Sequence, residues 1–405
     1  MSDFILGLII IGIAAIAVLY VERVFKSTLS LIIGIALVAL TLIIRIPMAD
    51  HQSGDYVSFL SIWVQHFRDG GGFAALKEGI GNYNVPYFYF LAAFSYSSAY
   101  DLHLIKLLSI FFDFVLAYGV MRLVNIFRKN PKRVLFAFFI TLFMPTVVLN
   151  GAYWGQCDSI YVAFAVWSIY FALSDHPIAS MVCIAVSFAF KLQAVFVMPV
   201  FLLFLYTKRI KWWHLAFFPL TYIAMIMPAV FIGRPFWETL LLYFSQATSI
   251  GSGLNYNSPS IFAIMNNISN AELASKIAIA CAAAFLIIVL AWLFTKRKSI
   301  SNHTALCCAV LFSIAVPFLL PHMHDRYFFM ADVLTVALAV ITPMFSVSAA
   351  CVSFGSLICY YGYFKGRYLI TPDFGAVAVM LAAILIILYM VYNNGLLSKK
   401  IEKRY

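Results

Sequence analysis

Residues 3–46 decide the class of fold, and they read DFILGLIIIGIAAIAVLYVERVFKSTLSLIIGIALVALTLIIRI. The stretch holds two apolar runs, 3–20 and 28–46, separated by a short turn that carries Arg23 and Lys26. A helix needs about 20 mostly apolar residues to cross the hydrocarbon core of a membrane. Two such runs around a basic turn therefore predict a pair of membrane-spanning helices.

The rest of the chain has the same character. Of its 405 residues 64% are apolar and 11% are charged, whereas about 25% are charged in ordinary soluble domains. This excludes a soluble enzyme, a disordered chain and a secreted disulfide scaffold, and the seven Cys have neither disulfide nor zinc spacing. We predict an all-α polytopic membrane protein, a single integral membrane domain over 1–405, with about thirteen transmembrane helices. The predicted spans are 3–20, 28–46, 103–125, 134–149, 159–173, 178–190, 193–206, 212–232, 273–294, 303–320, 328–345, 346–363 and 374–392. The pairs 178–190 with 193–206 and 328–345 with 346–363 are alternatively broken helices.

Basic residues alternate between loops and so predict an orientation. Clusters of Lys and Arg occur at 23–26, 128–133, 208–211, 296–298 and in the tail 393–405. The positive-inside rule places these segments in the cytoplasm. The N-terminal segment 1–27, which holds the first span, then begins outside the cytoplasm, and the tail ends in the cytoplasm. The net charge of +11 reflects this topology and contact with membrane lipid, so we expect no nucleic-acid partner.

Two long loops lie on the opposite side in this topology, at 47–102 and 233–272. In the first, Phe59, Ile62, Trp63 and Phe67 form an apolar stripe at helical spacing, which predicts an amphipathic helix over 55–67 at the membrane surface. The apolar segment 86–98 is too short to cross and is predicted to be re-entrant or interfacial.

The first polar constellation is Ser53-Gly54-Asp55-Tyr56, followed by Trp63. A carboxylate at the start of an interfacial helix can accept a proton from a substrate hydroxyl. The alternative is an acid in the first turn that is favoured only by the helix dipole. Asp50 lies close in sequence and is a rival for the same role.

The second constellation is Tyr153-Trp154-Gly155-Gln156-Cys157-Asp158, at the outer start of a span. An aromatic ring, an amide and an acid together are suited to holding a sugar ring. The aromatic residues are alternatively part of an interface belt. Gln156 and Asp158 are polar groups at a membrane boundary, and such groups usually have a partner.

The third constellation, Lys191-Leu192-Gln193, interrupts an apolar stretch. A Lys there is costly unless it is paired or faces water, so Lys191 is a candidate cation for an anionic headgroup. The alternative is a Lys that snorkels to the interface.

The fourth constellation is Pro321-His322-Met323-His324-Asp325-Arg326-Tyr327. Two His without a well-spaced third ligand are weak evidence for a metal, and none is predicted. His322, His324 and Arg326 suit a phosphate, because Arg offers a planar fork of donors to its oxygens. A structural turn is the alternative.

These segments, in this order, resemble the GT-C superfamily of polyprenyl-phosphate-sugar-dependent glycosyltransferases, and most nearly bacterial relatives of the GPI-anchor mannosyltransferases. The likeness covers residues 45 to 332. Gly54-Asp55-Tyr56 with Trp63 looks like the first-loop motif, and 154–158 looks like Trp-Gly-Gln-x-Asp. Lys191-Leu192-Gln193 is similar to Lys-x-Gln, and 322–326 is similar to His-x-His-Glu-Lys. The segment with Asn82 and Tyr83 looks like Asp-Tyr-Pro-Pro, but Asn replaces its acid and the paired prolines are missing.

The resemblance implies an inverting hexosyltransferase, mannosyl or glucosyl, with Asp55 as the general base in the outer catalytic loop. Its donor would be a polyprenyl-phosphate sugar, its acceptor a lipid-linked or envelope glycan, and it would need no cofactor. The implied setting is a bacterial cell membrane, with the site on the extracytoplasmic side. The donor and acceptor would contact residues of these segments and the nearby Asp50, namely Asp50, Trp63, Asn82, Tyr83, Trp154, Gln156, Asp158, Lys191, Gln193, His322, His324 and Arg326. The alternative function is a transporter or flippase of a lipid-linked glycan.

Overall fold

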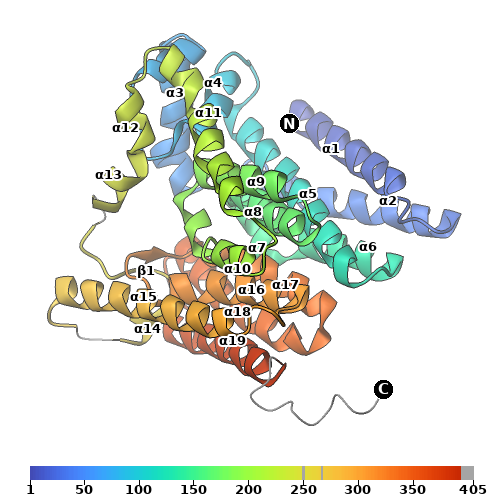
Figure 1. Cartoon of the computed structure of the whole chain (residues 1–405). Coiled ribbons are helices and arrows are strands. Elements are labelled where there is room, and N and C mark those ends of the chain that lie inside the picture. The colour runs from blue at the N-terminus through green and yellow to red at the C-terminus, as the bar shows by residue number, and fades with distance from the viewer. Residues whose placement is uncertain (249–250, 266–267, 394–405) are drawn as a thin grey trace. The chain divides into compact units, whose positions relative to one another are not determined.

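The computed structural model describes residues 1–248, 251–265 and 268–393 (Figure 1). The described chain is mostly helical and has almost no strand, which agrees with the predicted all-α class. Its packing divides it into two compact units. Unit 1 comprises Met1–Ser168, Ser180–Ala194 and Ala216–Ser249, and unit 2 comprises Ile169–Ala179, Val195–Leu215 and Ile250–Tyr405. The predicted single domain over 1–405 stays a prediction.

Helices make up nearly all of both units. Unit 1 holds α1 (Ser2–Val21), α2 (Thr28–Ile43), α3 (Ser61–Asp69), α4 (Val85–Phe94), α5 (Asp101–Phe127), α6 (Pro131–Phe143), α7 (Pro145–Val148), most of α8 (Asp158–Leu173) and α9 (Pro177–Phe190), α11 (Phe217–Phe231), α12 (Phe236–Leu240) and α13 (Leu242–Thr248). Unit 2 holds α10 (Val200–Tyr206), α14 (Ile261–Ile264), α15 (Ala271–Thr295), α16 (Asn302–Leu319), α17 (Phe329–Ile341), α18 (Ser346–Lys365) and α19 (Pro372–Asn393).

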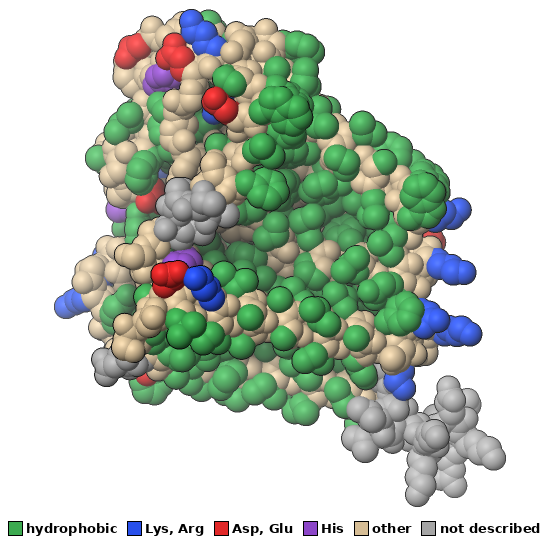
Figure 2. All heavy atoms as spheres, turned by 60° about the vertical axis from the view of Figure 1, so that its left-hand side comes forward, with side chains coloured by type: hydrophobic (Ala, Val, Ile, Leu, Met, Phe, Trp, Pro, Cys, Tyr) green, Lys and Arg blue, Asp and Glu red, His purple; other side chains and the backbone are tan. Residues whose placement is uncertain are grey.

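The membrane character is confirmed, but the count of thirteen spans is not. Eight helical segments in the described part of the chain are long and apolar enough to cross a membrane, or nine if the bent pair Pro131–Phe143 and Pro145–Trp154 forms one span. Four more predicted spans correspond to shorter elements: α8, α9, α17, and α10 with the 3-10 turn before it. Hydrophobic side chains cover much of the surface seen in Figure 2.

In unit 1, α1 and α2 pack against α5 and α6 through a continuous apolar core. Phe4, Leu8 and Leu19 of α1 are buried there, whereas Leu6 and Ile10 on the other face of the helix are more than half exposed. This one-sided burial is the pattern expected of a helix whose outer face meets lipid.

A buried ion pair crosses this core. Arg45, just after α2, lies 3.1 Å from the Asp113 carboxylate of α5, and neither side chain is exposed. The guanidinium also donates to the Leu142 carbonyl at 3.1 Å and to the Thr41 carbonyl at 2.7 Å. Ser159, at the start of α8, donates to the other Asp113 oxygen. The pair therefore links four elements of unit 1.

The first long loop forms helices, as predicted, but its apolar stripe is divided. A π-helical turn, Tyr56–Leu60, leads directly into α3. Phe59 and Ile62 are about half exposed, whereas Trp63 and Phe67 are buried against Phe88 of α4. The helix predicted over 55–67 is therefore present, with α4 covering the side that carries Trp63 and Phe67; its location at the membrane surface stays a prediction. Residues 86–98 are represented by α4, a helix of 10 residues.

Unit 2 is built around α16, whose residues 304–318 are all buried. Helices α17 and α19 pack against it, and α18 packs against α17 and α19. Gly355 of α18 and Gly375 of α19 come so close that a Cβ added at Gly375 would lie 3.1 Å from the Gly355 Cα. The second long loop contains α12, α13, α14 and the strand β1 (Asn255–Tyr256), which pairs in parallel with β2 (Met323–His324). The predicted basic tail, 393–405, lies outside the described residues from residue 394 onward.

We expect Arg45→Met to destabilise the protein by about 3–5 kcal/mol, because it leaves the Asp113 carboxylate buried without its cation. The double variant Arg45→Met/Asp113→Leu should regain most of that loss, since no charge remains to be buried. Thermal unfolding in detergent measures both effects. The matched control is Glu272→Ala, which breaks a fully exposed pair with Lys276 and should leave the unfolding temperature nearly unchanged. An unaltered unfolding temperature for Arg45→Met would contradict the assigned role of the pair.

Candidate active site

Asp55 lies at the entrance to the π-helical turn, half-buried, and two side chains of one segment hold its carboxylate. The indole N–H of Trp154 donates to the Asp55 Oδ2 atom at 3.0 Å. The side-chain amide of Gln156 donates to the same oxygen. Two donors on one oxygen fix the orientation of the carboxylate, which is what a positioned base requires.

The geometry of segment 149–156 explains why both donors reach one oxygen. Leu149–Trp154 forms a π-helical turn, and Gly155 follows with φ of +77°, a backbone conformation that favours glycine. The backbone N–H of Gln156 then donates to the Asn150 carbonyl at 3.0 Å. Ser109 of α5 donates to the Gln156 carbonyl at 2.7 Å. The chain therefore reverses between Trp154 and Gln156, and the two side chains converge.

The loop that carries Asp55 is held by several further hydrogen bonds. Ser53 donates to the Trp154 carbonyl at 2.7 Å and accepts from the backbone N–H of Tyr56. The Tyr56 hydroxyl donates to the Asp101 carboxylate at 2.8 Å. Burial and this carboxylate raise the pKa of the Tyr56 phenol far above its usual range, so the hydroxyl stays a donor. The Lys106 ammonium of α5 donates to the Met48 and His51 carbonyls.

Asp50 does not share the contacts of Asp55. Its carboxylate lies 2.7 Å from the Nε2 atom of the buried His103, and 67% of the side chain is exposed. The next residue, His51, stacks on Tyr153 with ring centroids 3.6 Å apart. Asp50 is therefore an accessible carboxylate on the same loop, held by a separate partner.

Tyr83 contacts Gln156, which binds Asp55, and Lys191, which binds Asp158. Its hydroxyl donates to the Gln156 side-chain oxygen at 3.4 Å, and its ring packs edge-on against Trp63. Trp63 is buried under Tyr83, and Trp154 is fully buried. Neither indole therefore offers an exposed face on which a sugar ring could stack. Asn82 is exposed on the same segment.

Asp158 and Lys191 form a buried ion pair. Asn150 donates to the second Asp158 oxygen at 2.8 Å. The Lys191 ammonium also lies over the Tyr83 ring, 5.3 Å from its centroid. Gln193 follows in the next turn and is half-buried. Lys191 is thus paired with a carboxylate of the predicted site, a partner that its spacing did not reveal.

Unit 1 therefore brings together the predicted residues Asp55, Trp154, Gln156, Tyr83, Asp158 and Lys191. The contributors that the sequence analysis missed were Lys106, Asp113, Ser109, Asn150 and His103. Lys106 and Asp113 did carry a signal, since ionisable residues inside an apolar span usually have a structural or functional partner.

The fourth constellation lies in unit 2, where β2 pairs with β1. His322 has φ of +64°, and its Nδ1 atom donates to the Gly253 carbonyl at 2.7 Å. Its other ring nitrogen faces the Ser275 hydroxyl at 3.2 Å. The His324 ring stacks on Tyr256, with centroids 4.8 Å apart and planes within 13°. Both imidazoles are therefore held in fixed orientations.

The Asn257 side chain makes three hydrogen bonds in this region. Its amide donates to the Cys359 carbonyl at 2.8 Å and to the Asp325 carboxylate at 3.4 Å. Its side-chain oxygen accepts from the Tyr368 hydroxyl at 2.8 Å, and burial raises the pKa of that phenol. Asp325 also lies 4.0 Å from the Arg326 guanidinium. Among the described residues, no group of three or more His, Cys, Asp or Glu is arranged to hold a metal ion.

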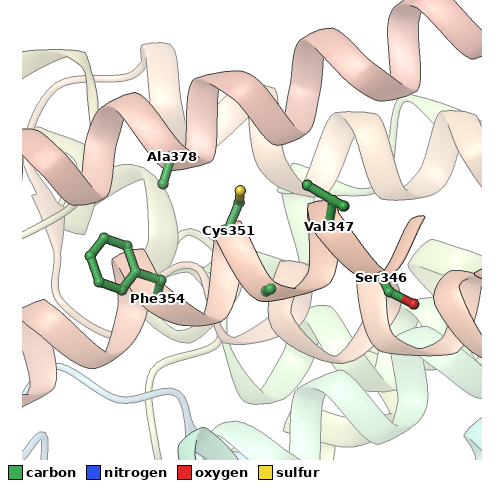
Figure 3. A pocket seen from close by; sticks show the side chains of 6 residues that line it. Ser346, Val347, Cys351, Phe354 and Ala378 are labelled. Atoms are coloured by element: carbon green, nitrogen blue, oxygen red, sulfur yellow. The ribbon is translucent and has the colours of Figure 1, made fainter. Parts of the chain in front are cut away.

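A pocket elsewhere in unit 2 contains none of the predicted residues. It lies between α18 and α19 and is lined by Ser346, Val347, Ala350, Cys351, Phe354 and Ala378 (Figure 3). Its lining is mostly apolar and holds no carboxylate, imidazole or ammonium group, so it is not a candidate active site.

Comparison with known proteins assigns a family. The model of glycosyltransferase family 87 matches residues 83–321, which is more than half of the chain. The match includes the segments of Tyr83, Trp154 to Asp158 and Lys191, whereas Asp55 precedes it and His322 follows it directly. It supports the expected GT-C type, although the resemblance to relatives of the GPI-anchor mannosyltransferases is not confirmed. No curated protein matches the chain. The chain belongs to glycosyltransferase family 87.

Proposed function

We propose that this glycosyltransferase moves a hexose from a polyprenyl-phosphate sugar to a hydroxyl of an extracytoplasmic acceptor, with inversion at the anomeric carbon. The observation that carries the proposal is the half-buried Asp55 carboxylate, oriented by the Trp154 and Gln156 side chains. A carboxylate oriented in this way can serve as a general base. Family membership favours this enzyme over a transporter or flippase of a lipid-linked glycan.

In the proposed reaction, Asp55 accepts the proton of the acceptor hydroxyl. The hydroxyl oxygen forms a bond to the anomeric carbon while the bond from that carbon to the phosphate oxygen breaks. The electron pair leaves with the polyprenyl phosphate, and the proton remains on Asp55. Attack opposite to the leaving group inverts the configuration of the sugar.

Negative charge grows on the phosphate as it leaves, so preorganised cations stabilise the transition state. The candidate for this role in unit 1, which carries Asp55, is Lys191; in unit 2 the candidate is Arg326, with His322 and His324. These cations would make a metal unnecessary, and the proposal includes no cofactor. In unit 1 the exposed Asp50 and Asn82 and the half-buried Gln193 are proposed to contact donor or acceptor.

The donor sugar is proposed to be mannose or glucose, and the acceptor a lipid-linked or envelope glycan of a bacterial cell membrane. Both substrates would be confined to the membrane, which fits a site carried by loops between apolar helices. Assaying purified protein against a panel of polyprenyl-phosphate sugars identifies the donor.

We expect Asp55→Asn to insert and fold normally and to lose about 10²–10⁴ in transfer rate, because the amide cannot accept the proton. The measurement is transfer of labelled sugar from a polyprenyl-phosphate donor by purified protein. Asp50→Asn is the matched control, since it removes a nearby carboxylate with different partners, and it should retain base catalysis. Wild-type turnover by Asp55→Asn would move the role of base to Asp50 or Asp158.

A second prediction separates a structural role of Lys191, as the ion-pair partner of Asp158, from a role in binding the donor. Lys191→Met alone should destabilise the protein, since it leaves the Asp158 carboxylate buried and unpaired. Lys191→Met/Asp158→Leu should unfold close to the wild-type temperature yet bind donor about ten- to hundredfold more weakly, through loss of one charged contact. Unchanged donor affinity in the stable double variant would restrict Lys191 to a structural role.

The third prediction concerns the phosphate. Arg326→Lys keeps the charge and removes the planar fork of donors. If Arg326 binds the phosphate in the ground state, the donor KM should rise; if it acts only as the phosphate leaves, kcat should fall with binding unchanged. Arg326→Ala with both constants unchanged would refute a phosphate site and leave a structural turn. A chelator should not inhibit the wild type, whereas inhibition reversed by zinc would point to His322 and His324 as ligands.

A further inference from the structure

The paired short helices α12 and α13 expose large apolar side chains along one face. Trp237 is 69% exposed, Leu241 46% and Phe244 74%. Their spacing of four and three residues places them on one side of a helical path. Glu238 and Ser245 are exposed polar residues within the same segment.

The opposite face of these helices is packed into unit 1. Thr239 and Tyr243 are buried, and Tyr243 packs edge-on against Phe188 of α9. The Tyr243 hydroxyl donates to the Ala189 carbonyl at 3.2 Å. The Tyr222 hydroxyl of α11 donates to the Leu240 carbonyl at 3.4 Å. These contacts fix the rotation of the two helices, so the exposed face has a defined direction.

The exposed face continues the surface of a membrane span. Trp212–Phe231, which includes α11, is long and apolar enough to cross a membrane, and Phe231 at its end is 81% exposed. Helix α12 begins five residues later, and Figure 1 shows α12 and α13 following α11 along the edge of unit 1. Arg234, in the turn between them, donates to the Leu76 and Glu78 carbonyls, which holds the corner in place. The environment that surrounds the exposed face of α11 therefore extends to α12 and α13.

We propose that Trp237, Leu241 and Phe244 dock into the lipid leaflet at the membrane–water interface, with α12 and α13 lying along it. Trp is enriched at this interface because its ring is apolar and its N–H is polar. A short helical segment with an apolar face and a polar flank lies in the interface plane rather than across the bilayer. The partner is thus the lipid surface itself.

Hydrogen bonds connect this face to the candidate active site. Tyr222 accepts from the side-chain amide of Asn84 at 3.1 Å, and Asn84 adjoins Tyr83. Gln246 of α13 donates to the Asn82 carbonyl. Docking would therefore set the depth of the Tyr83 segment relative to the lipid. This consequence, unlike the docking itself, rests on the proposed function, in which the donor is held in the membrane by its polyprenyl chain.

The docking is tested without activity. Phe244→Cys and Glu238→Cys, in a background without the seven native Cys, are labelled with an environment-sensitive fluorophore and placed in nanodiscs. We expect the label at 244 to be blue-shifted and quenched by brominated lipid, and the label at 238, on the polar flank, to be quenched much less. Equal and weak quenching at both positions would overturn the proposal. Thermal unfolding of each labelled protein verifies that it is folded.

The consequence is tested with two donors. Trp237→Ser/Phe244→Ser should transfer sugar from a full-length polyprenyl donor in proteoliposomes about tenfold or more slowly than the wild type. With a short-chain, water-soluble donor in detergent, the two proteins should be alike. Equal loss with both donors would show a folding defect and contradict the positioning role. Absence of transfer by the wild type with either donor would instead refute the proposed function and leave the quenching result standing.

Discussion

The cost of burying charge in an apolar protein is the constraint on which the structure of unit 1 depends. Isolated ions inside a membrane protein are expensive, and they persist where each has a partner. Two buried carboxylates, Asp113 and Asp158, meet this requirement through Arg45 and Lys191. Both pairs are tied to the start of α8, the first through the Ser159 hydroxyl and the second through Asp158 itself. Removing any one of these groups would leave a buried charge next to the candidate site.

This arrangement explains why the segment before α8 can hold an unusual backbone. The π-helical turn Leu149–Trp154 and the left-handed Gly155 lie between fixed points. Asn150 binds the Asp158 carboxylate at one side, and Ser109 binds the Gln156 carbonyl at the other. π-Helical turns are rare and occur frequently at functional sites. Here the turn allows two side-chain donors, two residues apart, to reach one carboxylate oxygen.

The sequence was sufficient to predict the helical membrane class, the two long loops and the segments that form the candidate site. It could not supply the number of spans, because short helices such as α8 and α9 are covered by neighbouring helices and do not need the length of a lipid-facing span. Burial of Trp63 and Trp154 was also not predictable. An aromatic residue at a loop edge has the same pattern whether it faces a ligand, lipid or another helix.

Pairing within the site was equally hidden from the sequence. Lys191 interrupts an apolar stretch, and this pattern is typical of both a ligand-binding cation and half of a buried ion pair. Only the fold shows that Asp158, 33 residues earlier, is its partner. Lys106 and Asp113 were overlooked because the long helix α5 keeps a strongly apolar signal despite them. Polar residues inside predicted spans are therefore the most informative positions to examine in such a sequence.

The proposed mechanism requires the half-buried Asp55, as the proposed base, to meet a donor that is held in the membrane. A lipid-linked donor keeps its reacting carbon within a few bonds of the headgroup level, so the depth of the base relative to the lipid matters as much as its chemistry. In unit 1 the segment that includes Tyr83 is bonded on one side to Gln156 and on the other, through Asn84, to Tyr222. Since Gln156 orients Asp55, a change in the position of α11 or α12 would be transmitted to the carboxylate through side chains in direct contact. A misplacement of about 1 Å can cost roughly a hundredfold in rate. The chain of contacts from α11 through Asn84, Tyr83 and Gln156 to Asp55 is therefore a requirement of the proposed chemistry, and not only of the fold.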